Sequence, residues 1–241
     1  MKDIDAIAML QDPVRRRLYE YVAAQGREVG RNEAAEAAGV ARTLAAHHLD
    51  RLTEAGLLES GSRRLTGRSG PGAGRPAKVY TRARAERSVS LPARDYLTAA
   101  ELLAEAAEQA GLDAALCAAA GRRGEALRGS APPCGGLEEA MEMLAGRGYE
   151  PYLEGGEGVA GGDGVQDAEG AVAVTGAPEP VVRMRNCPFH AVAEHFPPLV
   201  CGMNLALLEG LFGADGPVRA RMDARPGECC VVIENSKNND R

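Results

Sequence analysis

Helix-starting and helix-ending residues divide the first part of the chain into short helical segments. Asp12-Pro13 predicts a helix start, because an aspartate side chain caps free backbone amides and proline fits the first helical position. Apolar residues then recur at helical spacing until Gly26, which predicts the end of that helix. Two more helices are expected over residues 32–38 and 42–55, each followed by a glycine. Short helices of this order, followed by the apolar pair Leu57-Leu58, are typical of a helix-turn-helix domain.

The helix expected over residues 42–55 presents polar and basic side chains on its outward face. Ala45, Leu49 and Leu52 share the inward face, and His48 is expected to lean toward the core. Arginine binds guanine edges in a bidentate manner, and threonine hydrogen-bonds to bases or phosphates. For one of these residues, the histidine at 47, a solvated helix face explains the pattern as well as a DNA contact does. The candidate DNA contacts on this helix are Arg42, Thr43, His47 and Arg51.

A basic segment rich in glycine and proline follows. From Ser60 to Arg87 the chain has eight basic residues and one acidic residue. Strands are predicted around residues 62–65 and 78–81, so this segment is expected to be a β-hairpin, or wing. Its tip would lie along the phosphates or in the minor groove, which attracts arginine when it is narrow. A flexible, solvated hairpin is the alternative, and the position directly after a helix-turn-helix favours DNA binding. The candidate contacts here are Arg63, Arg64, Arg75 and Lys78.

Charge divides the chain into two parts. The net charge of −6 by itself speaks against a nucleic-acid partner. However, residues 1–90 carry 16 Lys and Arg against 11 Asp and Glu, whereas residues 91–241 carry 12 against 23. A net charge of +5 joined to one of −11 indicates that one part contacts DNA and the other does not.

The middle of the chain is expected to be helical. Residues 93–127 are rich in alanine, leucine and glutamate, which are strong helix formers. Leu97, Leu102 and Leu103 would form an apolar stripe that one helix cannot bury alone. The stripe can pack on the C-terminal part or pair with a second copy. Pairing would make a homodimer with two recognition helices about one DNA turn apart, as a palindromic operator in double-stranded DNA requires.

The C-terminal part alternates predicted strands and helices. Helices are expected over 137–146 and 201–211, and strands over 149–153, 181–185, 218–222 and 229–233, which indicates an α+β domain. The GxGxxG pattern from Gly156 to Gly161 is followed by more glycine and not by a helix start, so we interpret it as a mobile loop.

Four of the six cysteines lie between residues 187 and 230. Cys187 is predicted at a strand end, Cys201 at a helix start and Cys229 at a strand start, where free backbone amides can donate to thiolates. A helix N-terminus would also favour the thiolate of Cys201. Neighbours in a strand point to opposite faces, so Cys229 and Cys230 are not expected to bind one cluster together. Three cysteines could therefore hold an iron–sulfur cluster.

The fourth position of such a cluster stays open in the sequence. His190 or His195 could complete the ligand set, or one iron could be left without a protein ligand. Zinc is disfavoured because no CxxC pair is present, and HxxxEH differs in spacing from zinc-protease motifs. A redox disulfide such as Cys187–Cys201, or four unrelated buried thiols, are the remaining alternatives. The other cysteines are at 117, expected to be a small buried apolar residue, and at 134, in a predicted linker.

Other classes of protein find little support. No run of about 18 apolar residues exists, so no membrane span is expected. The acidic N-terminal sequence MKDIDAIAML argues against a signal peptide, and we expect a cytoplasmic protein. No GxSxG or histidine–acid nucleophile motif is present, so we do not expect an enzyme.

These features give an α+β chain with an N-terminal winged helix-turn-helix, central dimerisation helices and a small C-terminal α+β sensor domain. The predicted boundaries are 1–90 for the DNA-binding domain, 91–134 for the helical dimerisation and linker region, and 135–241 for the iron–sulfur sensor domain.

The sequence also resembles known repressors. The segments GVARTLAAHHLDRLTEAGLL and GAGRPAKVY resemble winged-helix repressors of the DeoR/ArsR type. The segments NCPFHAVA, VCGMNLALLEGLF and PGECCV resemble the SufR family, repressors of iron–sulfur cluster assembly (suf) operons. The similarity extends over most of the chain apart from residues near 155–170. Cys187, Cys201 and Cys229 match the family's three cluster cysteines in order and spacing.

The resemblance implies a homodimer with one [4Fe-4S] cluster per subunit. It also implies that the cluster-loaded form represses and that cluster loss releases DNA. The alternative is a winged-helix repressor that senses a small-molecule effector or thiol redox state through the same C-terminal domain. Two departures from the family stand out. Ala41 lies where many members have a serine cap, and the additional Cys230 leaves the third ligand open between Cys229 and Cys230.

Overall fold

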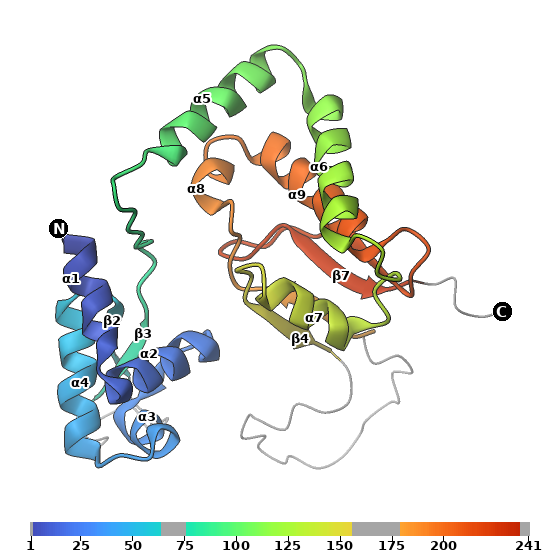
Figure 1. The fold of residues 1–241 in the computed structure, drawn as a ribbon. Coiled ribbons are helices and arrows are strands. Elements are labelled where there is room, and N and C mark those ends of the chain that lie inside the picture. Colours follow the sequence, from blue (N-terminus) through green and yellow to red (C-terminus); the bar gives the residue numbers. More distant parts are fainter. Residues whose placement is uncertain (1, 64–75, 156–178, 237–241) are drawn as a thin grey trace. The chain divides into compact units, whose positions relative to one another are not determined.

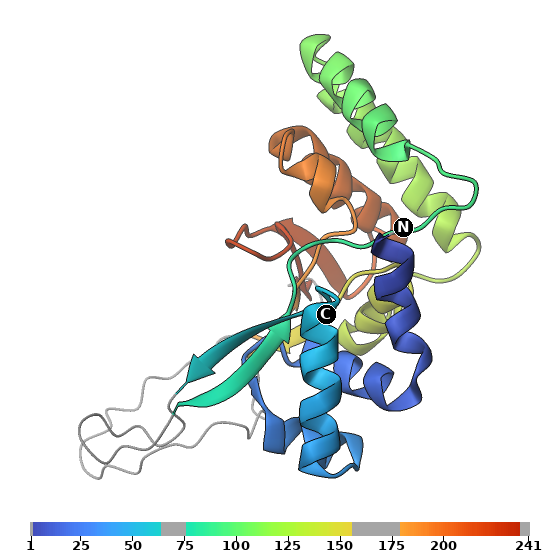
Figure 2. The same ribbon diagram turned by 90° about the vertical axis from the view of Figure 1, so that its left-hand side faces the viewer.

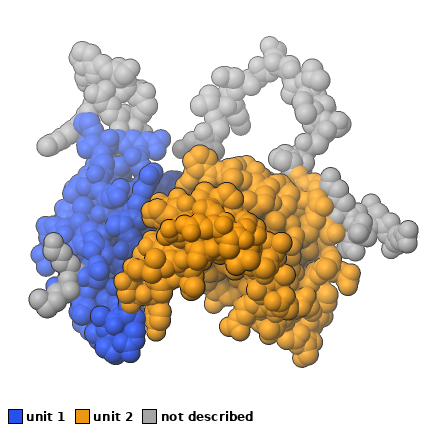
Figure 3. All heavy atoms as spheres, turned by 90° about the horizontal axis from the view of Figure 1, so that it is seen from above, with its two compact units in different colours: residues 1–94 blue, residues 95–241 orange. Residues whose placement is uncertain are grey.

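The computed structural model describes residues 2–63, 76–155 and 179–236 (Figure 1). The chain divides into two compact units, residues 1–94 and 95–241 (Figure 3). The wing tip with Arg64 and Arg75, and the glycine pattern of Gly156–Gly161, lie outside the described residues.

The helices of unit 1 begin and end largely where the sequence signals predict. Asp12 caps the first long helix, because its Oδ1 accepts the backbone N–H groups of Val14 at 2.9 Å and Arg15 at 3.0 Å. Gly26 ends this helix with a left-handed φ of 62°. An N-terminal helical segment was not predicted. The helical elements of unit 1 are α1 (Lys2–Ala8), the 3-10 helix η1 (Met9–Gln11), α2 (Pro13–Gln25), α3 (Arg31–Ala38) and α4 (Arg42–Glu54).

The turn between α3 and α4 depends on Gly39. Its φ is 65°, a left-handed conformation that costs glycine little, and its N–H donates to the carbonyls of Ala35 and Glu36. Ala45, Leu49 and Leu52 of α4 are buried, as predicted, in the core of unit 1. The helix-turn-helix arrangement is thus fixed by one turn and one shared apolar core.

A small antiparallel sheet completes unit 1. Its strands β1 (Val29–Gly30), β2 (Leu58–Arg63) and β3 (Ala77–Arg82) are ordered β1-β3-β2. The hairpin β2–β3 pairs Leu58 with Arg82 and Arg63 with Ala77, and it projects beyond the helices (Figure 2). Both strands are longer than predicted. Unit 1 is therefore a winged helix-turn-helix.

The helix predicted over residues 93–127 is in fact two helices. Gly111 interrupts it with a left-handed φ of 63°. The prediction overlooked this glycine because the flanking alanines and leucines continue the helical composition. The helices of unit 2 are α5 (Tyr96–Gln109), α6 (Asp113–Arg128), α7 (Leu137–Ala145), α8 (His190–Ala193) and α9 (Pro197–Phe212).

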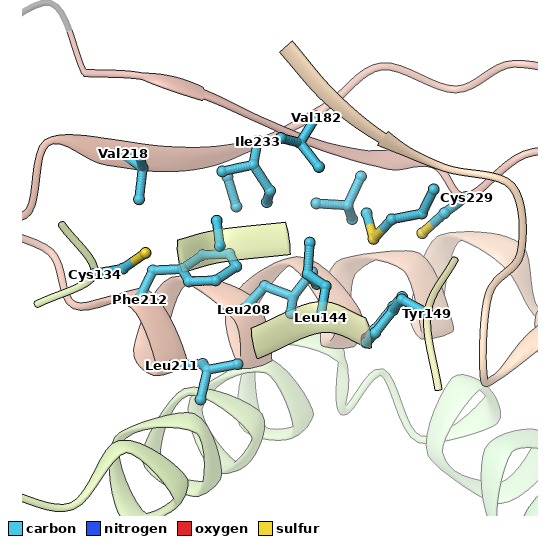
Figure 4. Close-up of a cluster of buried hydrophobic side chains, with 14 residues drawn as sticks. Cys134, Leu144, Tyr149, Val182, Leu208, Leu211, Phe212, Val218, Cys229 and Ile233 are labelled. Carbon is cyan, nitrogen blue, oxygen red and sulfur yellow. The ribbon is translucent and has the colours of Figure 1, made fainter. Parts of the chain in front are cut away.

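Unit 2 is built on an antiparallel sheet of order β4-β5-β7-β6. Helices α7 and α9 cover one face of this sheet and enclose the apolar core (Figure 1, Figure 4). Tyr149 and Cys229 lie at one end of the row of buried side chains, and Cys134 lies at the other (Figure 4). The strands are β4 (Pro151–Glu154), β5 (Val181–Met184), β6 (Val218–Met222) and β7 (Val231–Asn235). These elements confirm the α+β fold class.

The opposite face of the sheet carries charged side chains. Arg183 on β5 is only 2% exposed, and its guanidinium contacts Glu154 at 2.7 Å and Asp223 at 2.5 Å. Glu228 lies 3.8 Å from the same guanidinium. Two of these acids belong to the segment between β6 and β7, so Arg183 holds that segment against the sheet.

Helices α6 and α9 pack with their backbones in contact. A Cβ atom at Gly124 would collide with the carbonyl oxygen of Leu207, and one at Gly210 would collide with that of Gly121. The absence of side chains at Gly124 and Gly210 permits this close approach. The position of α9 is therefore tied to that of α6. Among the described helices, none combines the length and the apolar character needed to cross a bilayer.

Candidate DNA interface and cysteine site

Helix α4 exposes the side chains that the sequence analysis proposed as DNA contacts. The side chains of Arg42, Thr43, His47 and Arg51 are all exposed on it. Leu44, which the sequence reasoning missed, is 41% exposed on the same helix. The sequence could have predicted this exposure, because position 44 does not share the helical spacing of the buried residues at 45, 49 and 52. An exposed leucine at this place suits an apolar contact with a thymine methyl group.

Asp50 ties α4 to α3 and to the wing. Its carboxylate accepts hydrogen bonds from Lys78 Nζ at 2.7 Å and Tyr80 Oη at 2.6 Å. The guanidinium of Arg31 lies 3.3 Å away. Burial raises the pKa of Asp50, but the bonds from Lys78 and Tyr80 outweigh it, and the net pKa is lowered. The predicted DNA contact Lys78 is thus engaged within unit 1, and it fixes the base of the wing against α4.

The remaining arginines are differently placed. Arg51 pairs with Glu54 at 3.2 Å and Arg63 with Glu28 at 3.5 Å, both on the surface. Exposed pairs of this kind contribute about 0–1 kcal/mol, so a phosphate can replace the carboxylate at little cost. Arg42 forms no ion pair within residues 2–63, 76–155 and 179–236. A groove between α3, the start of α4 and the hairpin is lined by both basic and acidic side chains. The basic ones are Arg27, Arg31, Arg42, Arg63 and Lys78, and the acidic ones are Glu28 and Glu33.

His48 is half-buried beside the start of α2 rather than directed to solvent. Its Nδ1 atom is buried and has no hydrogen-bond partner among the described residues. Burial lowers the pKa of His48. The geometry places this residue in the packing of the helices.

The four C-terminal cysteines form two pairs within unit 2. The Sγ atoms of Cys201 and Cys230 lie 2.8 Å apart, and the side chains of Cys187 and Cys229 are hydrogen-bonded. The two pairs are close enough for each thiol to influence the pKa of its neighbours. They come from three places: the turn after β5, helix α9 and the segment before β7. We call these residues the four-thiol cluster.

Cys201 does not lie at a helix start, as the sequence reasoning expected. Pro197 and Pro198 do not interrupt a helix but begin α9, because proline has no N–H to lose in the first helical turn. Cys201 therefore falls in the second turn, where the backbone amides are already bonded. Burial raises the pKa of its thiol to about 12. The expected thiolate stabilisation by the helix terminus is wrong.

Cys229 and Cys230 do not lie in a strand. Strand β7 begins only at Val231, and Cys230 occupies a bend. The N–H of Cys229 donates to the carbonyl of Met184 at 3.0 Å, and the carbonyl of Cys230 accepts from Asp223 at 2.8 Å. The alternation of strand neighbours therefore does not apply. The two thiols nevertheless lie in different pairs, Cys229 with Cys187 and Cys230 with Cys201, and the expectation that they do not bind one cluster together stays a prediction.

Hydrogen-bond donors surround the cluster. The amide Nδ2 of Asn204 donates to Cys229 Sγ at 3.4 Å, and Tyr149 O–H donates to Asn204 Oδ1 at 2.5 Å. The backbone amide of Phe189 bonds to Cys187, and that of Val231 bonds to Cys229. Asn204 is 1% exposed and was missed by the sequence reasoning, although an asparagine amid the apolar residues of α9 is an unusual choice.

The cysteine side chains are of the type that binds iron–sulfur clusters, but their arrangement in the described part of the chain does not form a metal site. Cysteine thiolates with hydrogen-bond donors around their sulfurs are the ligands of such clusters. Among the described residues, no three His, Cys, Asp or Glu side chains are grouped so as to hold a metal ion. A zinc ion would separate two thiolates by about 3.8 Å, since each Zn–S bond is about 2.3 Å. The 2.8 Å between Cys201 and Cys230 is shorter, so metal binding requires these thiols to move apart.

The predicted histidine ligands lie on the surface. His190 is 64% exposed, and its Nε2 is 3.1 Å from Glu194. His195 is 65% exposed, with its Nδ1 3.8 Å from Glu101 of α5. Neither imidazole contacts a thiol of the four-thiol cluster within the described part of the chain.

The other two cysteines serve packing. Cys134 was expected in a linker, but it is buried in the core of unit 2, and its N–H donates to the carbonyl of Phe212 at 2.8 Å. Cys117, expected to be buried, is half-buried on α6 and faces Gly202 of α9.

Comparison with known proteins identifies the N-terminal domain. Residues 10–61 match a family described as a helix-turn-helix domain. This match and the winged fold of unit 1 establish a helix-turn-helix DNA-binding domain. The comparisons with curated proteins and with solved structures found no match.

Proposed function

We propose that the chain is a homodimeric transcriptional repressor of the SufR type, whose affinity for DNA depends on an iron–sulfur cluster. The proposed cluster is [4Fe-4S], with Cys187, Cys201 and Cys229 among its ligands, and the proposed target is a suf operon. The observation that carries the proposal is the four-thiol cluster in a chain whose other unit is a helix-turn-helix domain. The resemblance of the cysteine-containing segments to SufR supports it.

The bound cluster would supply an inorganic group whose presence depends on iron supply and oxidants. The protein's own role would be to convert a change in the distance between its thiols into a movement of its helices. Cys201 is on α9, and α9 is packed backbone to backbone on α6 through Gly124 and Gly210. Helix α6 in turn follows α5, the first helix after the boundary between the units. A coupling free energy of about 1–3 kcal/mol along this route would change DNA affinity about 5- to 150-fold.

The surface of α5 supports a homodimer. Leu97, Leu102 and Leu103 are all exposed there, as is Tyr96 at the start of the same helix. An apolar helix face of this kind is stabilised when it is covered by another chain. A second copy would bring the two α4 helices to a palindromic operator in double-stranded DNA.

The test is anaerobic purification followed by iron and sulfide analysis and DNA titration. We expect a coloured protein with equal amounts of iron and acid-labile sulfide. Cys187→Ser should lose the cluster and weaken operator binding about 5- to 150-fold, whereas Cys117→Ser, the matched control outside the cluster, should keep both. A wild-type protein that holds no iron after anaerobic reconstitution would contradict the proposal.

A thiol switch is a second candidate, favoured by one distance. Cys201 and Cys230 have their sulfurs 2.8 Å apart, so hydrogen peroxide could oxidise them to a disulfide, with release of two water molecules. This pair replaces Cys187–Cys201 as the plausible partners. The switch predicts that peroxide changes the DNA affinity of iron-free protein and that Cys230→Ser abolishes the response. If a small molecule is the effector instead, Cys187→Ser should leave regulation intact.

A further inference from the structure

We infer that Cys230 supplies the fourth thiolate, so that the cluster of the proposed function is held by four cysteines and no iron is left open. The inference rests on that proposed function. It replaces the open or histidine-ligated iron that the sequence alone allowed.

The backbone presents Cys230 to Cys201, one of the proposed ligands. Its carbonyl is bonded to the N–H of Asp223 across the base of the segment between β6 and β7. The preceding residue, Cys229, is bonded through its N–H to Met184 of β5. These bonds hold the bend, and the Cys230 thiol lies in contact with the thiol of Cys201.

Other side chains near the cluster are already committed. Tyr149 donates to Asn204, and Asn204 presents its amide N–H, not its oxygen, to Cys229. Asp223 binds the guanidiniums of Arg183 and Arg221.

The remaining oxygen and nitrogen donors include one carboxylate. One oxygen of Glu228 accepts from Tyr152 O–H at 2.6 Å, and the other lies 3.8 Å from the Arg183 guanidinium without a hydrogen-bond partner among the described residues. His190 and His195 are exposed and pair with glutamates. Cys230 is the further thiol in contact with a proposed ligand, Cys201, and a thiolate is preferred over a carboxylate as a ligand of such clusters.

Four-cysteine ligation has a chemical consequence. An iron that carries a non-cysteine ligand or an open position can bind added small ligands and is the first to be lost on oxidation. With Cys230 bound, each of the four irons would carry a cysteine ligand. The protein would then respond to loss of the whole cluster rather than to ligand exchange at one iron.

The first experiment uses the wild-type protein and cysteine mapping. Cluster-loaded and iron-free protein are alkylated anaerobically, and the labelled cysteines are identified by mass spectrometry. We expect Cys230 to be protected only in the loaded protein, together with Cys187, Cys201 and Cys229. Cys117, the control, should label equally in both. Labelling of Cys230 in loaded protein to the same extent as in iron-free protein would overturn the inference and leave the proposed function intact.

The second experiment compares iron environments by Mössbauer spectroscopy of protein reconstituted with iron-57. Wild-type protein should show no site-differentiated iron, whereas Cys230→Asp should show one distinct iron and form a [3Fe-4S] cluster on mild oxidation, detected by electron paramagnetic resonance. A distinct iron already present in the wild type would overturn the inference. Wild-type protein that takes up no cluster at all would overturn the proposed function and this inference with it.

Discussion

The pKa values of Cys187 and Cys229 are shifted in opposite directions. The hydrogen bond with Cys229 lowers the pKa of Cys187, and the same bond together with burial raises the pKa of Cys229. Proton loss from the pair therefore occurs at Cys187, while Cys229 keeps its proton. Cluster ligation needs every bound thiol to be deprotonated. Iron loading should thus release protons, and a rise in pH should favour it.

His48 gives unit 1 a dependence on pH. Burial lowers its pKa below the ordinary 6.5, so the unfolded chain binds this proton more readily. The contribution to stability is therefore complete above about pH 6.5 and is lost as the pH falls through the range between the two pKa values.

We expect urea unfolding of the wild type to shift to lower urea when the pH drops from about 7.5 to about 5.5, and to shift less in His48→Phe. Phenylalanine keeps a planar ring in the same place without a proton to gain. An equal shift in both proteins would show that His48 does not contribute.

Residue-level predictions succeeded where one side chain decides a local structure. The Asp12 cap and the turns at Gly26 and Gly39 were predictable because each acts through its own backbone. The convergence of Cys230 with Cys201 was not, since it depends on β7 beginning two residues later than its apolar pattern suggests. Asn204 was missed because only the tertiary structure shows what it contacts.

The contact between α6 and α9 determines where Cys201 lies. Gly124 and Gly210 bring the two backbones together, and a side chain at either position has no space. Gly121, on the same helix as Gly124, differs: an added Cβ would lie 3.7 Å from the carbonyl oxygen of Ala206, an ordinary contact.

Gly124→Ala should destabilise unit 2 by about 1–3 kcal/mol, because the two helices must move apart. Gly121→Ala, the matched control, should be neutral or stabilise by up to about 1 kcal/mol, since alanine favours helix. Urea unfolding of the full chain measures both. Equal midpoints for the two variants would show that the backbone contact does not constrain α9.

Elements were predicted well where apolar periodicity and a clear stop coincide. Helix α7 and strand β6 lie within a residue of their predicted ranges. The break at Gly111 and the start of α9 at Pro197 were predicted incorrectly. Glycine can lie within a helix or end it, and proline can begin a helix or interrupt it. Which of these roles the residue has depends on what the flanking helices pack against.

The two units differ in charge as well as in fold. The basic residues gather in the part of the chain with the helix-turn-helix, and the acidic excess lies in the part with the thiols. This division keeps the second part from binding DNA nonspecifically. It also means that DNA affinity should vary with salt through unit 1 alone.

Arg42→Ala and Arg63→Ala should therefore have different effects on DNA binding. Arg42 is exposed on α4 and free of ion pairs among the described residues, so its loss should cost about 1–3 kcal/mol and relax sequence preference. Arg63, on the wing, should affect all sequences alike and reduce the salt slope by about 1. Operator and random DNA are titrated at two salt concentrations. Unchanged affinity in both variants would show that α4 and the wing do not face DNA.

If the chain is the repressor proposed above, the contact between Cys201 and Cys230 also determines how a molecule that has lost its cluster could bind one again. Two sulfurs this close, once stripped of iron, form an easy target for air or peroxide. A molecule with this disulfide cannot bind a new cluster from iron and sulfide alone. Recovery of repression would then also require a cellular dithiol to reduce the disulfide. The operon would be transcribed until both iron and this reductant were present again.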